Sequence, residues 1–234
     1  MISLTLLLVK KMKKINFNSK TILPVVSYLL ALILNGCAGT IPKEPSWAET
    51  TLQTLSLREK IAQMMVSYMN TRFKDIPKAK WDEINSLITS DGIGSVHLWY
   101  GDAGSSITMM NEMQSASNIP ILFNADIEYG LNQRFPFGTD LPPLMAIAAT
   151  GNPDNAYQVG KIIAEEARVV GIHWNLSPVV DVNNNPFNPI INTRSFGEDP
   201  DVVSAFGISL MKGLQENGVL ATAKHFPGHG DTET

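Results

Sequence analysis

The sequence is poor in three features that would place it in a special class of protein. It has one cysteine, Cys37, so an internal disulfide is excluded. The apolar run from Ile22 to Leu34 has about 13 residues, fewer than the roughly 20 that a comfortable membrane span needs. Acidic residues outnumber basic ones, and the formal net charge of −4 gives no electrostatic support for nucleic-acid binding. The composition is that of an ordinary globular protein with ample apolar content for a core.

The N-terminal segment has the layout of an export signal. An apolar run follows a basic start, a pattern typical of signal peptides, and the basic residues are Lys10, Lys11, Lys13, Lys14 and Lys20. The run ends in Leu34-Asn35-Gly36-Cys37, which resembles a bacterial lipobox. We therefore expect a lipoprotein signal peptide over residues 1–36, starting at Met1 or Met12. A lipidated Cys37 and a tether over 37–50 would then anchor the protein to a membrane of the bacterial cell envelope, facing the periplasm or the cell surface.

Short apolar runs alternate with helical patterns along the rest of the chain. Five strands are predicted, over residues 64–68, 93–99, 119–125, 172–176 and 219–223. Helices are predicted over residues 47–64, 105–117 and 154–170, and from Asp199-Pro200 to Gly218. Ser56 with Glu59 forms a capping-box pattern, and Leu57, Ile61 and Met64 or Met65 fall on one helix face.

This alternation predicts parallel βα units, either in an open doubly wound sheet or in a closed eight-fold barrel. No Gly-x-Gly-x-x-Gly turn follows the first strand, which disfavours a dinucleotide-binding fold. Polar residues cluster just after strands three, four and five, the face on which barrel enzymes carry their sites. Two long loops on that face, residues 128–153 and 177–198, are expected to build a site.

Length constrains the barrel interpretation. Without the leader, roughly 200 residues remain, whereas an eight-unit barrel typically takes about 250. Five βα units are predicted, and the sequence stops in the loop after the fifth strand. We therefore expect residues 51–234 to be part of a (β/α)8 TIM-type barrel, of which about the first five βα units are present.

The residues after these strands suit a polyhydroxylated ligand. Lys and Arg donate hydrogen bonds to hydroxyl groups, and a carboxylate accepts from two neighbouring hydroxyls, so a sugar matches the set. The candidates are Asp126, Glu128, Arg134, Arg194, Lys224, His225, His229 and Asp231. Taken singly, Asp126 could cap a turn, and the two arginines could be surface or ion-pair residues.

Other polar and aromatic residues have simpler explanations. His173 and Trp174 are expected in the core or lining the barrel, while His97 and Trp99 stay ambiguous. Asp181 is expected to structure its Asn-rich loop. His225 and His229 are four apart with Pro227 and Gly228 between them, so a helical zinc pair is disfavoured. We predict no metal site and no cofactor.

The segment Lys224 to Thr232, Lys-His-Phe-Pro-Gly-His-Gly-Asp-Thr, resembles the signature of family 3 glycoside hydrolases of the β-N-acetylglucosaminidase type. Three further segments agree with that family in order. They are 125–130 with Gln133-Arg134-Phe135, then 177–183, then 194–200. Tyr129 and Leu131 depart from the family pattern. The resemblance covers nearly all of residues 55–234.

The resemblance implies a retaining β-N-acetylhexosaminidase acting on N-acetylglucosamine-containing glycans in carbohydrate metabolism, such as cell-wall recycling. It also maps five residues onto substrate-binding positions: Asp126, Arg134, Arg194, Lys224 and His225. The family's Asp-x-His acid/base dyad and its Asp nucleophile are expected beyond Thr234, so no catalytic residue is assigned and the chain as given is expected to be inactive. The alternatives are a β-glucosidase or β-xylosidase of the same family and a non-catalytic sugar-binding lipoprotein. Oligomeric state is left open.

Overall fold

The computed structural model describes residues 44–72 and 76–233. The predicted signal peptide and Cys37 lie outside the described residues. The chain divides into two compact units between Gln53 and Thr54. Helix α3 (Trp47–Thr54), of which all but Thr54 belongs to the first unit, buries none of its residues. Within the two described ranges, no helix combines the length and the apolar character needed to cross a bilayer.

The helix predicted over residues 47–64 is two helices. The second, α4 (Leu57–Gln63), begins anew because Ser56 takes an extended conformation and caps it. The Ser56 side chain accepts from the Glu59 N–H, and the Glu59 side chain accepts from the Ser56 N–H. This is the predicted capping box, which satisfies two otherwise unpaired donors at the helix start.

The apolar face of α4 is exposed. Leu57 and Ile61 keep more than half of their surface in solvent. They line a surface cavity of about 480 Å³, together with Met65, Leu87 and Ile93.

Five strands form one sheet in chain order, and each pairs in parallel with the next. They are β1 (Val66–Thr71), β2 (Ser95–Gly101), β3 (Leu122–Ala125), β4 (Trp174–Asn175) and β5 (Leu220–Ala221). An unbroken sequential order is the arrangement of a barrel wall, whereas a doubly wound sheet reverses its strand order at a switch point. The α/β class with a parallel sheet is confirmed, although most strands are shorter than the apolar runs that predicted them.

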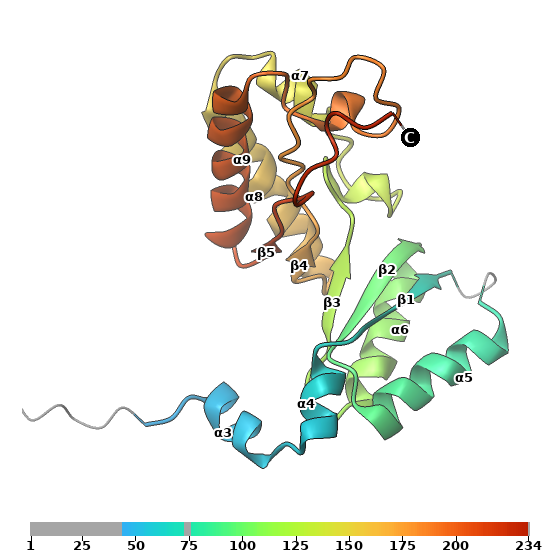
Figure 1. The fold of residues 1–234 in the computed structure, drawn as a ribbon. Coiled ribbons are helices and arrows are strands. Elements are labelled where there is room, and N and C mark those ends of the chain that lie inside the picture. The colour runs from blue at the N-terminus through green and yellow to red at the C-terminus, as the bar shows by residue number, and fades with distance from the viewer. Residues whose placement is uncertain (1–43, 73–75, 234) are drawn as a thin grey trace, which may run out of the picture. The chain divides into compact units, whose positions relative to one another are not determined.

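Helices connect the strands (Figure 1). They are α5 (Lys78–Ser86), which continues into a short π-helix over Leu87–Asp91, and α6 (Ala103–Ala116), α7 (Leu144–Ala148), α8 (Pro153–Val170) and α9 (Pro200–Gln215). Short 3₁₀ turns cover Leu131–Gln133 and Asn192–Arg194. The predicted helix boundaries at Asp199 and Gly171 are confirmed. Asp199 caps the start of α9, and Gly171 ends α8 in the left-handed conformation with φ of 94°. Helices α5 and α7 were not predicted.

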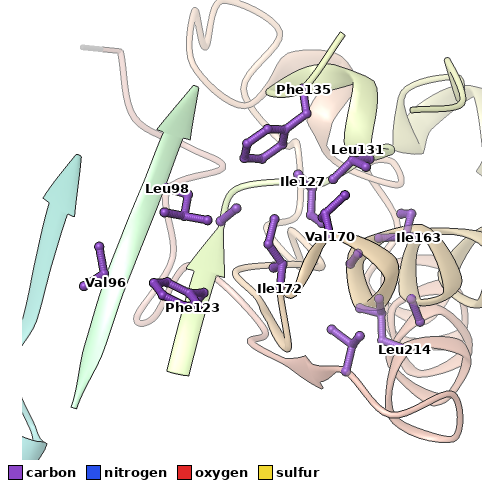
Figure 2. Packing of buried hydrophobic residues seen from close by; sticks show 14 of the residues in the cluster. Val96, Leu98, Phe123, Ile127, Leu131, Phe135, Ile163, Val170, Ile172 and Leu214 are labelled. Carbon is purple, nitrogen blue, oxygen red and sulfur yellow. The ribbon is translucent and has the colours of Figure 1, made fainter. Parts of the chain in front are cut away.

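The core lies between the sheet and its helices (Figure 2). Val96 and Leu98 alternate along β2 with residues that face the other side, and Ile163 and Leu214 come from α8 and α9. Each fully buried Leu or Ile contributes about 1.5–3 kcal/mol relative to exposure. The same core holds the loops after the strands, because Ile127, Leu131 and Phe135 are buried in it.

Helices α8 and α9 approach closely through two glycines. A Cβ on Gly213 would lie 2.3 Å from the Tyr157 carbonyl oxygen, and one on Gly160 would lie 2.4 Å from that of Leu210. Real Cβ contacts are not this short, so a larger residue would push the helices apart.

Candidate functional site

Asp126 directly follows β3 at the carboxyl end of the sheet. A neighbouring strand fixes its backbone: Asn175 of β4 donates to the Ile127 carbonyl at 3.0 Å and accepts from the Ile127 N–H at 3.2 Å. Asn175 is fully buried, so both bonds form away from water, where they are strongest. This clamp sets the direction in which Asp126 and Glu128 leave the strand.

Lys224 reaches both of these carboxylates. The chain after β5 keeps pairing with the segment after β4, because the Val180 N–H donates to the Lys224 carbonyl at 2.6 Å and the Lys224 N–H donates to the Pro178 carbonyl at 3.0 Å. That pairing points the side chain inward. Lys224 Nζ lies 2.6 Å from Asp126 Oδ1 and 2.8 Å from Glu128 Oε1. The sequence-predicted residues Asp126 and Lys224, 98 positions apart, are thus in direct contact.

Glu128 joins Lys224 to Arg194. Arg194 donates from Nε to Oε2 at 2.9 Å and from its terminal nitrogen to Oε1 at 2.7 Å, the two-pronged geometry that makes arginine–carboxylate pairs strong. Burial of Glu128 raises the pKa of its carboxyl, but the hydrogen bond from Arg194 and the charge of Lys224 outweigh burial, and the net pKa is lowered from 4.5. The hydrogen bond to Glu128 raises the pKa of Arg194. Glu128 is therefore a buried carboxylate whose charge is matched by two cations.

Arg134 lies on the opposite side of Asp126. Its Nε donates to the Asp126 carbonyl at 3.2 Å, and its terminal nitrogen lies 4.0 Å from Asp126 Oδ2. The guanidinium carbon stands 4.4 Å from the ring centre of Trp99 and 5.3 Å from that of Tyr100. Cation–π contact at this range holds the arginine in place, with both rings partly exposed beside it.

His225 is oriented by Asp181. Its Nδ1 lies 2.6 Å from Asp181 Oδ2, and its backbone N–H donates to the same oxygen at 3.2 Å. The His229 N–H donates to the other oxygen at 2.6 Å. An ionised carboxylate only accepts, so Nδ1 of His225 carries a proton and Nε2 is left for a ligand. Asp181 does structure a loop, as expected, but the loop is the one after β5 and not its own Asn-rich segment.

The long loop over residues 177–198 supports the segment after β5. Asn188 donates to the His229 carbonyl at 2.6 Å, and Asn185 donates to the carbonyls of Asp231 and Thr232. A surface cavity of about 420 Å³ lies between the two segments, a size typical of small-ligand sites. Its lining includes Asp181, Asn184, His225, Gly228 and Asp231. The loop over residues 177–198 thus contributes part of the lining of this cavity.

The five sequence-predicted binding residues lie close together. Asp126, Arg134, Arg194 and Lys224 form one charged group joined through Glu128, and His225 follows Lys224 in the chain. Glu128 was noted in the sequence but not assigned to the site. The sequence signal that could have found it is its position, only two residues after Asp126 in the same loop after β3.

The structure also places His173 and Trp174. His173 does not lie in the core, because it is exposed and its Nδ1 is 3.0 Å from the Gly171 carbonyl. Trp174 is partly buried and donates to Thr222 Oγ1 at 2.7 Å. Over residues 44–72 and 76–233, no three His, Cys, Asp or Glu side chains are grouped so as to hold a metal ion.

The sheet and its strand-end charges define a parallel α/β domain of barrel type with a polar site on its carboxyl face. The profile described as "Glycosyl hydrolase family 3 N terminal domain" matches residues 56–234, and the chain belongs to this family.

Relatives and solved structures agree with the family. The chain is 34% identical over 190 residues to a beta-N-acetylglucosaminidase/beta-glucosidase of Cellulomonas fimi, covering 80% of this chain and 32% of that protein. It is 37% identical to beta-hexosaminidase A of Pseudoalteromonas piscicida, covering 64% and 27%. A family 3 beta-N-acetylglucosaminidase from Paenibacillus sp. str. FPU-7 superposes with a TM-score of 0.68 at 34% identity, covering 77% and 35%. The chain thus spans about a third of the length of these relatives.

Proposed function

We propose that residues 54–234 bind the sugar in a retaining β-N-acetylhexosaminidase that hydrolyses N-acetylglucosamine-containing glycans. The observation that carries the proposal is the contact of Lys224 with both Asp126 and Glu128. It places a cation and a carboxylate side by side at the end of the sheet, where a ligand's neighbouring hydroxyls can meet both. The role assigned to these residues is binding and not bond cleavage.

The site keeps hydrogen-bonding capacity for a ligand. Lys224 has three N–H donors and directs two of them at carboxylates. Asp126 Oδ2 has no hydrogen-bond partner within the described residues, since Arg134 lies 4.0 Å away. His225 Nε2 is a third open position. One donor and two acceptors in one small area match a ring with several adjacent hydroxyls, each of which can both donate and accept.

The charge balance favours a neutral ligand. Lys224 and Arg194 are paired with Asp126 and Glu128. The third cation, Arg134, lies 4.0 Å from Asp126 Oδ2 and rests against two aromatic rings. A phosphate or carboxylate ligand would meet two fixed carboxylates, and like charges in contact are costly. A neutral sugar exchanges hydrogen bonds with water for hydrogen bonds with the site and meets no such penalty.

Calorimetric titration with N-acetylglucosamine tests the proposal. Lys224→Met should weaken binding by about tenfold or more, because it removes a charged donor worth about 1.5–3 kcal/mol. Lys212→Met, at an exposed lysine of α9, is the matched control and should bind as the parent does. Equal affinity in the parent and Lys224→Met would refute the assignment.

Parallel titrations separate the alternatives. Tighter binding of glucose or xylose than of N-acetylglucosamine would favour the β-glucosidase or β-xylosidase alternative. Sugar binding by a full-length gene product that never cleaves a 4-nitrophenyl N-acetylglucosaminide would favour the sugar-binding lipoprotein.

We further propose that Cys37 is lipidated and anchors the protein to a membrane of the bacterial envelope. The support is the sequence alone: a basic start, an apolar run and Cys37 after Gly36. Mass spectrometry of the protein from its native membrane should show acyl chains on Cys37, and Cys37→Ser should release the protein from that membrane. An unmodified Cys37 in mature protein would refute the anchor.

A further inference from the structure

A row of polar side chains runs along the paired strands β2 and β3 and ends at Asp126. Ser95 and His97 of β2 are in register with Leu122 and Asn124 of β3. Ser95 Oγ donates to the Leu122 carbonyl, Asn124 Nδ2 donates to Ser95 Oγ at 2.7 Å, and Asn124 Oδ1 lies 2.6 Å from His97 Nδ1. Ser95 and Asn124 are buried, so water cannot substitute for any of these partners.

This row fixes the orientation of the Asn124 amide. Ser95 has a single hydroxyl proton, which goes to the Leu122 carbonyl, so Ser95 Oγ must accept from Asn124 Nδ2. If the amide were reversed, Asn124 Oδ1 would face Ser95 Oγ and would need the Ser95 proton. Ser95 Oγ and the Leu122 carbonyl oxygen would then face each other without a proton between them. Asn124 Oδ1 therefore faces His97, and His97 Nδ1 must carry a proton to donate to it.

The other ring nitrogen of His97 faces Asp126. Nε2 is buried, has no hydrogen-bond partner in the described part of the chain, and lies 3.8 Å from Asp126 Oδ2. Asp126 also meets Lys224 at Oδ1 and Arg134 near Oδ2, and the Trp99 ring centre is 5.5 Å from that of His97. The Asp126 side chain is 18% exposed, but His97 Nε2 is buried, and a buried polar atom left without a partner costs free energy.

We propose that His97 is a positioning residue for Asp126. Its Nε2 carries a proton in addition to the one on Nδ1, so the ring is an imidazolium whose charge faces Asp126 Oδ2 across 3.8 Å. Lys224 holds Oδ1, and the two cations together fix the carboxylate plane for the sugar hydroxyls. The buried row through Asn124 and Ser95 keeps the imidazole in this orientation. The inference rests on the proposed sugar-binding function and adds a residue to it.

A double-mutant cycle on sugar affinity tests the coupling. His97→Asn keeps a polar group near Asn124 but is too short to reach Asp126, and it should weaken N-acetylglucosamine binding by about tenfold. His97→Gln restores an amide near the Nε2 position and should recover most of that loss. In an Asp126→Asn background, His97→Asn should have no further effect. A tenfold loss in both backgrounds, or no loss in either, would overturn the proposal.

Two controls separate a positioning role from loss of fold. His173→Asn changes the exposed histidine that precedes β4 and should leave affinity unchanged. Thermal unfolding of each variant reports stability, and loss of affinity that simply tracks loss of stability counts against positioning.

Imidazole ¹⁵N NMR of the sugar-free protein tests the contact between His97 and Asp126 even if no sugar binds. We expect a protonated Nε2 on His97 whose shift changes in Asp126→Asn but not in the control Asp82→Asn. If the parent binds no sugar, the proposed function fails, while this signal still supports the His97–Asp126 contact. An unprotonated Nε2 whose ¹⁵N shift does not change in Asp126→Asn would overturn the positioning role whether or not sugar binds.

Discussion

Asp181 accepts three hydrogen bonds from the segment that follows β5, and His225 supplies two of them. The His225 ring and backbone nitrogens lie 2.6 and 3.2 Å from the same carboxylate oxygen, and the His229 N–H donates to the other oxygen. The carboxylate is buried and 44 positions away in the chain. One side chain after β4 thus sets both the backbone and the ring orientation of a predicted sugar ligand.

Asp181→Asn should weaken this arrangement. An amide offers one acceptor oxygen where the three donors need two, and its NH₂ group would face an N–H donor. We expect a loss of roughly 1–3 kcal/mol in the free energy of unfolding, with weaker N-acetylglucosamine binding. Urea denaturation measures the first effect and calorimetry the second. Asp82→Asn, in an exposed pair with Lys78, should change unfolding by about 0.5 kcal/mol or less.

Glu128→Gln should remove a pH-dependent part of the stability. The folded-state pKa of Glu128 is lowered from 4.5, so its contribution is fully present above about pH 4.5 and is lost as pH falls through the lower folded value. At neutral pH the variant should lose roughly 3 kcal/mol, because Arg194 and Lys224 lose a shared partner.

Denaturation of the parent and Glu128→Gln as a function of pH checks this. The difference between the two should be constant from neutral pH to about 4.5 and shrink below it. A difference that grows on acidification would contradict a lowered pKa.

Gly213→Ala should loosen the pair of α8 and α9. The new methyl would clash with the Tyr157 backbone, and overpacking of this kind costs about 1–3 kcal/mol. The control is Gly104→Ala in α6, where the nearest atom is 3.8 Å away and alanine's helix propensity should leave stability equal or higher. Thermal unfolding of both variants measures the contrast, and equal shifts would argue against the close approach.

Trp99→Ala should weaken sugar binding by removing the ring that holds Arg134. Trp99 is 41% exposed, while the guanidinium rests 4.4 Å from its ring centre. We expect a loss of about three- to tenfold, in line with a cation–π contact of about 0.5–1 kcal/mol and the lost apolar surface. Trp99→Phe, which keeps a flat ring, should lose less. Equal affinities in the parent and Trp99→Ala would refute this role.

Signals local to the chain predicted the fold well. The structure has the predicted helix boundaries: the capping box at Ser56, the N-cap at Asp199 and the helix end at Gly171. Helix α5 gave no comparable signal, because Pro77 provides no side-chain cap and Ile84 is its one buried residue. The break at Ser56 shows that one residue can both cap a new helix and end the preceding pattern.

The site was only partly predictable. The strand-end rule indicated that Asp126 and Lys224 would share one face, and the structure brings them into contact. The roles of Asn175 and Asp181 depend on partners more than 40 positions away, which no local pattern encodes. His97 was ambiguous because a histidine in a strand can face either the core or the site.

The structure of the protein with N-acetylglucosamine bound tests the account most directly. Sugar hydroxyl oxygens should lie within hydrogen-bond distance, about 2.6–3.2 Å, of Lys224 Nζ and the Asp126 carboxylate, with His225 Nε2 facing the ring. A sugar bound elsewhere, with Lys224 still engaged only by Asp126 and Glu128, would contradict the proposed site.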